Sequence, residues 1–123
     1  LISRPTHVPE DLVCEKLLSQ YDFVPTLLGY LGMEFPADKP LPGKDFSSIL
    51  RGKSLGVSTP VFVLDEYGST RMIRTETWKY VHRYPAGPHE LYNLVSDPSE
   101  SSNLIDGGEH QERIEYLRLE LEN

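Results

Sequence analysis

A run of alternating side chains between residues 71 and 84 constrains the fold of this chain more than any other feature. Residues 71–75 and 77–84 are rich in β-branched and aromatic side chains, which suit a pleated, half-buried surface. A short turn at residues 75–77 is enough to join the two runs as a hairpin. Side chains alternate between the two faces of a strand. The second run therefore places one set on one face (Trp78, Tyr80 and His82) and another set on the opposite face (Lys79, Val81 and Arg83).

The sequence on either side of this hairpin extends it into a sheet. Residues 60–65 form a continuous apolar run of strand length. The breaker cluster at residues 85–88 is followed by another short run, and residues 109–121 show one apolar helical face with Ile114, Leu117 and Leu121. We therefore predict an α+β fold in which a C-terminal helix at 109–121 packs on a four-stranded antiparallel sheet. The predicted strands are 60–65, 71–75, 77–83 and 90–94.

A short helical and loop region precedes the predicted sheet. Asp22 suits the N-cap of a helix over residues 23–31, and Gly32 suits its C-terminal end. The apolar residues of this helix fall at helical spacing, which predicts one packed stripe. These residues are Val24, Leu27, Leu28 and Leu31. Residues 45–50 predict one or two further helical turns.

An ordered set of short motifs runs through both parts. The motifs are RMIRT at 71–75, WKY at 78–80, ELYNL at 90–94, DPSE at 97–100 and NL at 103–104, with DFVPTLL at 22–28 and LPGKDF at 41–46 upstream. In this order they resemble the C-terminal region of the sulfatase family, arylsulfatase-like enzymes of the alkaline-phosphatase-like superfamily. Asn93 replaces the Asp that is usual in the fourth strand.

The resemblance implies a domain organisation and a function. Residues 1–59 would be a connecting region at the end of a catalytic domain, and residues 60–123 would be the C-terminal subdomain. The chain would then complete the fold of a sulfuric ester hydrolase and shape its substrate mouth, with no catalytic residues of its own. We expect the isolated chain to be inactive.

The resemblance also implies what the whole enzyme would use. The family carries a formylglycine nucleophile and usually calcium, and both would lie upstream, so we expect no cofactor in this chain. The implied partners are the upstream catalytic domain of the same polypeptide and a sulfated small molecule or glycan. Cys14, the single cysteine, is followed by Glu-Lys-Leu-Leu instead of the C-x-P/A-x-R motif that becomes formylglycine. Its expected role is that of a small apolar core residue.

Four residues are candidates for the substrate mouth: Glu66, Tyr67, Arg71 and His7. The first three surround a predicted turn at a strand end, where function concentrates. His7 lies in a proline-containing segment, where a surface-loop position is the simpler interpretation.

The strand pair at 71–84 is basic, with four Lys or Arg against one Glu. Such a stretch in an acidic chain could attract an anion such as a sulfated substrate. The simpler interpretation is that Arg74, Lys79 and Arg83 pair with carboxylates, Glu66 and Glu90 among them.

Charge and hydropathy exclude other classes of function. The formal net charge of −7 argues against general binding to nucleic acid or to a membrane surface. No apolar run reaches membrane-spanning length. Two alternatives remain open: the tail of a related phosphodiesterase or phosphonate hydrolase, and a free-standing binding module.

Overall fold

The computed structural model describes residues 2, 4–34, 40–53, 56, 58–65 and 67–122 of the chain. The chain forms two compact units, unit 1 over Leu1–Ser58 and unit 2 over Thr59–Asn123. In the described part, no helix is both long enough and apolar enough to cross a membrane.

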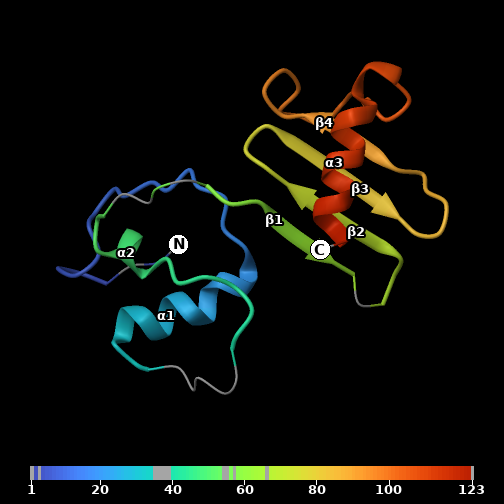
Figure 1. Ribbon diagram of the computed structural model, residues 1–123. Helices are drawn as coiled ribbons and strands as arrows, with labels where there is room; N and C mark the ends of the chain where they lie inside the picture. The colour runs from blue at the N-terminus through green and yellow to red at the C-terminus, as the bar shows by residue number, and fades with distance from the viewer. Residues whose placement is uncertain are drawn as a thin grey trace. The chain divides into compact units, whose positions relative to one another are not determined.

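Unit 2 is a four-stranded antiparallel sheet with one helix. The strands are β1 (Val61–Leu64), β2 (Thr70–Arg74), β3 (Trp78–Arg83) and β4 (Glu90–Asn93), in the spatial order β1-β2-β3-β4. The 3₁₀ helix η2 (Gly108–His110) leads into α3 (Gln111–Glu122), which crosses one face of the sheet (Figure 1). The predicted α+β class, the four strands and the C-terminal helix are confirmed.

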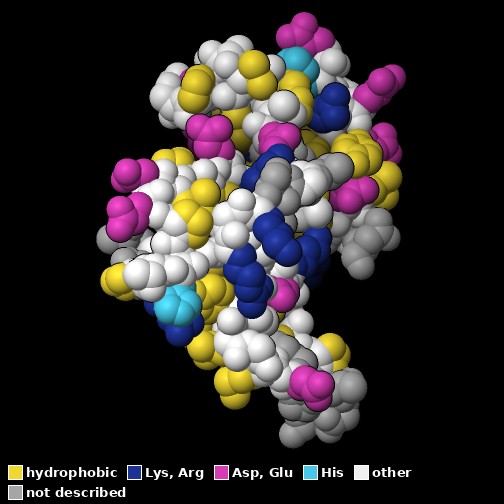
Figure 2. Space-filling view, turned by 90° about the vertical axis from the view of Figure 1, so that its left-hand side faces the viewer, with side chains coloured by type: hydrophobic (Ala, Val, Ile, Leu, Met, Phe, Trp, Pro, Cys, Tyr) yellow, Lys and Arg dark blue, Asp and Glu magenta, His cyan; other side chains and the backbone are white. Residues whose placement is uncertain are grey.

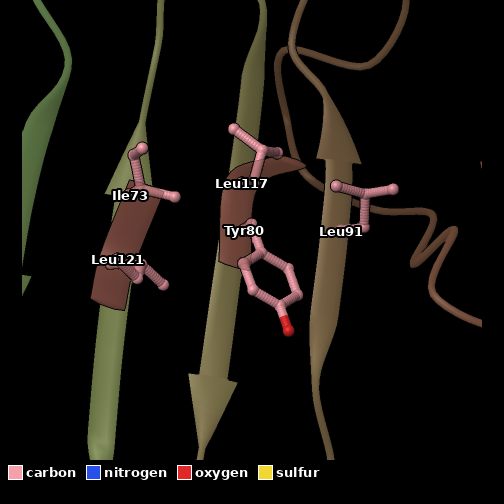
Figure 3. Close-up of a cluster of buried hydrophobic side chains, with 5 residues drawn as sticks. All are labelled: Ile73, Tyr80, Leu91, Leu117 and Leu121. Atoms are coloured by element: carbon pink, nitrogen blue, oxygen red, sulfur yellow. The ribbon is translucent and has the colours of Figure 1, made fainter. Parts of the chain in front are cut away.

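The register of the strands decides which side chains meet α3. Ile73 of β2 pairs with Tyr80 of β3, and Tyr80 pairs with Leu91 of β4, so the three side chains lie in a row on one face. Figure 3 shows this row with Leu117 and Leu121 of α3 lying over it. Ile73 and Leu91 are fully buried, and Tyr80 and Leu117 are 1% exposed. This cluster is the core of unit 2.

Ion pairs cover the opposite face of the sheet. The carboxylate of Glu100 binds both Arg74 and Lys79, and Arg83 lies 2.6 Å from Glu90. The prediction that these three cations pair with carboxylates is therefore confirmed. For Arg74 and Lys79, however, the partner is Glu100, more than twenty positions along the chain.

The turn that carries Glu100 is held by Asp97. Its carboxylate accepts hydrogen bonds from the Ser102 backbone at 2.8 Å and from the Ser99 and Ser101 hydroxyls. These bonds favour the ionised form and lower the pKa of Asp97 to about 2. Glu100 has a φ of 56°, a left-handed backbone conformation that non-glycine residues seldom adopt. The turn thus places one carboxylate over two strands.

Unit 1 contains the 3₁₀ helix η1 (Gln20–Asp22) and the helices α1 (Phe23–Leu31) and α2 (Ser47–Leu50). Asp22 is the N-cap residue of α1, as predicted, but its side chain makes no capping hydrogen bond to that helix. Instead its buried carboxylate accepts bonds from the Ser19 backbone N–H at 2.6 Å and from the Lys44 backbone N–H at 2.8 Å. Asp22 therefore ties the start of η1 to the segment before α2.

The apolar stripe of α1 is present, but three of its four side chains are exposed in the structure, while Leu28 is partly buried. Val24 is 47% exposed, Leu27 42% and Leu31 54%. Cys14 is also exposed, so the expectation that it is a core residue is wrong. Helical spacing predicts that a face will be covered but does not say which part of a protein covers it, and the apolar character of a cysteine does not by itself show that it is buried. Figure 2 shows hydrophobic side chains at the surface among the charged ones.

Two leucines of α3 test the assignment of the core. Leu117→Ala removes a buried side chain and should lower the free energy of unfolding by about 2–5 kcal/mol. Leu119→Ala makes the same change where 49% of the side chain is exposed, and should cost less than about 1 kcal/mol. Urea denaturation followed by the fluorescence of Trp78, the chain's single tryptophan, measures both. Equal losses in the two variants would contradict the packing described here.

Candidate substrate-mouth surface

Two of the four predicted mouth residues lie at one end of the sheet. Tyr67 is fully exposed in the turn between β1 and β2, and Arg71, at the start of β2, is exposed as well. The turn is held by the Asp65 carboxylate, which accepts hydrogen bonds from the backbone of Tyr67 at 3.0 Å and of Gly68 at 2.9 Å. Glu66 lies outside the described residues.

The fourth candidate, His7, belongs to unit 1. Its Nδ1 atom lies 3.1 Å from the Pro5 carbonyl oxygen and 3.1 Å from the Thr6 hydroxyl. These contacts are local, within a turn at the start of unit 1. They leave the proposed role of His7 at a substrate mouth as a prediction.

A cluster of rings beside Arg71 was not predicted from the sequence. His82 stacks on His89 with ring centroids 4.2 Å apart and planes 20° apart, and Tyr84 lies 4.2 Å from His82 on a tilted plane. The Arg71 guanidinium carbon lies 5.1 Å from the centre of the Tyr84 ring, a cation–π distance. We call these four residues the ring cluster. The sequence shows His82 and Arg71 on strands, but only the register places them opposite each other.

The ring cluster is anchored to the core of unit 2. The buried Tyr80 hydroxyl lies 2.8 Å from Nδ1 of His82. His89 is fixed by its own Nδ1, which accepts the backbone N–H of Arg83 at 3.2 Å. Through Tyr80, the middle member of the hydrophobic row, the core of unit 2 therefore contacts a group of titratable side chains.

The environment of His82 disfavours its charged form. Burial, and then the positive charge of His89 and Arg118, lower the pKa of His82 below its ordinary value of 6.5. Arg71 acts in the same direction, and Glu122 of α3 opposes them. The neutral imidazole is therefore the form that unit 2 stabilises.

Unit 1 holds a groove of about 810 Å³. Its lining includes Cys14, Phe23, Thr26, Phe46 and Ile49. The lining is mainly apolar, so the groove offers surface for packing and little for chemistry.

The described residues contain no group of three or more His, Cys, Asp or Glu side chains placed to hold a metal ion. Cys14 is exposed and lacks the motif that precedes formylglycine. The described part of the chain therefore does not fit the calcium site or the nucleophile that the resemblance implies for a whole enzyme.

Comparison with known protein families shows to which family this chain is related. The whole chain, residues 1–123, matches the family model described as N-sulphoglucosamine sulphohydrolase, C-terminal. The chain belongs to the sulfatase family. It corresponds to the C-terminal domain of that family, as the order of its motifs predicted.

Individual sulfatases agree with this assignment. The chain is 35% identical over 99 residues to the Delta 4,5-hexuronate-2-O-sulfatase of Bacteroides thetaiotaomicron, a match that covers 73% of this chain and 20% of that protein. The solved structure of a 2-O GAG sulfatase superposes with a TM-score of 0.66 at 30% identity, over 82% of this chain and 23% of that one. The sulfatase domain therefore spans about a fifth of the length of these relatives.

The fold is shared more widely. The phosphonate monoester hydrolase of Agrobacterium radiobacter superposes with a TM-score of 0.68 at 26% identity, over 88% of this sulfatase chain and 25% of the hydrolase. The related-hydrolase alternative thus has a structural neighbour, while the family match is to the sulfatases.

The lowered pKa of His82 predicts a pH dependence of stability. Because the folded pKa lies below the unfolded one, the unfolded state binds more protons, and stability falls as the pH drops through about 6.5. The urea midpoint reported by Trp78 should therefore be lower at about pH 5.5 than at about pH 8. His82→Gln should reduce this difference, whereas the matched control His7→Gln in unit 1 should leave it unchanged. A pH difference of the same size in wild type and His82→Gln would contradict the electrostatic description of His82.

Proposed function

We propose that this chain is the C-terminal portion of a sulfuric ester hydrolase whose catalytic domain precedes it in the same polypeptide. In this proposal residues 1–59 connect to that domain, and residues 60–123 cover it and shape the mouth through which a sulfated small molecule or glycan enters. Support comes from the family match over the whole chain and from the small share of each relative that the chain spans.

The observation that carries the proposal is the uncovered apolar stripe of α1. A helix of nine residues is too short to be stable through propensity alone, so it needs a packed face. In this chain Val24, Leu27 and Leu31 remain about half exposed. Apolar area of this kind is stabilising once it is removed from water, at roughly 25 cal/mol per Å². The catalytic domain is the partner that would cover it.

Unit 2 shows a second uncovered apolar area. β1 is one of the two edge strands of the sheet, and Phe62, Val63 and Leu64 are 38%, 43% and 51% exposed. An exposed apolar edge strand invites pairing or aggregation unless another part of the protein covers it. The proposed catalytic domain would protect this strand as well.

Catalytic groups would come from the rest of the polypeptide. In the family, formylglycine supplies the nucleophile and calcium balances charge on the sulfuryl oxygens. A calcium site takes about six to eight oxygen ligands. The described residues do not bring such ligands together. The role proposed for this chain is therefore positioning and access, through Glu66, Tyr67, Arg71 and His7.

The isolated chain should not hydrolyse 4-nitrophenyl sulfate and should not bind calcium at a single tight site, because its single cysteine lies outside the nucleophile motif and its described residues form no cluster of metal ligands. The same chain preceded by its catalytic domain should turn the substrate over. Turnover by the isolated chain that Cys14→Ser abolishes, or calcium affinity tighter than about 1 μM by calorimetry, would contradict the proposal.

The apolar stripe of α1 gives a second test of the proposal, in the protein that contains both the catalytic domain and this chain. Leu27→Asp places a charge where we propose that the catalytic domain packs, so activity or yield should fall at least about tenfold. Leu119→Asp is the control, because it places the same charge on a half-exposed position of α3. Equal activity in both variants would exclude α1 as a docking surface.

A further inference from the structure

Positive charge gathers at one end of unit 2 on the face that carries α3. Arg71 of β2 lies opposite His82 of β3, and His82 stacks on His89. Arg118 of α3 also acts electrostatically on His82. Two guanidinium groups and two imidazoles therefore share one small region of the surface.

Carboxylates do not balance this charge as they do on the opposite face of the sheet. There, Glu100 binds Arg74 and Lys79, and Glu90 binds Arg83. Near the ring cluster, Glu122 acts on His82, but it is half exposed and lies 3.8 Å from Arg118. Within the described residues Arg71 makes no ion pair, and its contact is with the face of the Tyr84 ring.

The imidazole of His89 has a hydrogen-bond donor that no described residue uses. Nδ1 of His89 accepts the Arg83 backbone N–H, so the neutral ring carries its proton on Nε2. In the described part of the chain, Nε2 of His89 has no hydrogen-bond partner. Gly87 leaves this edge of the ring open, since a Cβ there would lie 3.5 Å from Nε2.

We propose that Arg71, His82 and His89 bind a sulfate group of a sulfated saccharide, distinct from the ester that the catalytic domain would hydrolyse, with the Tyr84 ring beside it. This inference rests on the proposed function and names the residues of the mouth that would contact substrate. A guanidinium group presents paired N–H donors that match a tetrahedral oxyanion, and the imidazole Nε2–H adds a neutral donor. The half-buried ring faces provide apolar surface for the sugar.

The electrostatics of the site support this assignment. A bound anion offsets the repulsion that His89, Arg118 and Arg71 exert on protonated His82, while Glu122 already does so in part. Burial raises the pKa of Tyr80, so the hydroxyl that contacts His82 stays neutral, and the Tyr84 ring is the remaining titratable neighbour. Anion binding and protonation of His82 should therefore reinforce each other, and affinity should rise as the pH falls.

The test is an NMR titration of the histidine ring signals in the 123-residue chain with glucose 6-sulfate, compared with sodium sulfate and with glucose. We expect saturable shifts of His82 and His89, with a dissociation constant on the order of millimolar, and weaker binding of both comparison compounds. Arg71→Gln should weaken binding about fivefold or more. Arg74→Gln is the matched control, because it makes the same change on the opposite face of β2, and it should not alter the affinity. Native Trp78 fluorescence verifies that each variant is folded.

Unmoved His82 and His89 signals, or equal affinity in wild type and Arg71→Gln, would overturn the assignment. Equal binding of sodium sulfate and glucose 6-sulfate would overturn the saccharide as the ligand. Failure here is distinguishable from failure of the proposed function, because the Leu27→Asp comparison measures docking through unit 1 and does not involve the ring cluster.

Discussion

Burial of one row of side chains across the sheet, beneath α3, is the interaction on which unit 2 depends. Ile73, Tyr80 and Leu91 come from three adjacent strands, and Leu117 and Leu121 close the row from the helix. Each large apolar side chain removed from water contributes roughly 1.5–3 kcal/mol. The row also fixes the register, since a slip by one residue would turn every one of these side chains to the opposite face. The position of the ring cluster beside the row follows from that register, because Arg71 and His82 are the next pair on the same face of β2 and β3.

Unit 1 lacks a comparable core in the described part of the chain. Its order comes from polar ties, such as the Asp22 carboxylate, which joins η1 to the segment before α2. The apolar face of α1 stays half exposed. Unit 2 therefore packs a core of its own, although β1 keeps exposed apolar side chains, and in the proposal unit 1 presents α1 to a partner. A domain that spans about a fifth of its sulfatase relatives is expected to show this asymmetry.

Local patterns in the sequence predicted the strands and helices. They could not predict contacts between residues far apart in the chain, because such contacts depend on how the chain folds back. Alternation predicted the bounds of β3, and helical spacing predicted those of α3, to within one or two residues. Both periods directly reflect which face of the element is buried. The partner of Arg74 and Lys79 could not be predicted, because Glu100 reaches them through a turn far along the chain. The contact between His82 and His89 was missed for the same reason, since it depends on how residues 84–89 return the chain to β4. The roles of Tyr67 and Arg71 at a mouth remain predictions.

Amide hydrogen exchange gives the most direct test of the central claim. This claim is that unit 2 has a packed core of its own, whereas α1 of unit 1 is stabilised only when the catalytic domain covers its apolar face. In the 123-residue chain, amides of β3 should be protected to nearly the global free energy of unfolding, and amides of α1 should exchange far faster. When the catalytic domain precedes the chain, protection of α1 should rise by about a hundredfold or more, with β3 little changed. Protection of α1 that equals that of β3 in the isolated chain, or that does not change in the longer protein, would contradict the claim.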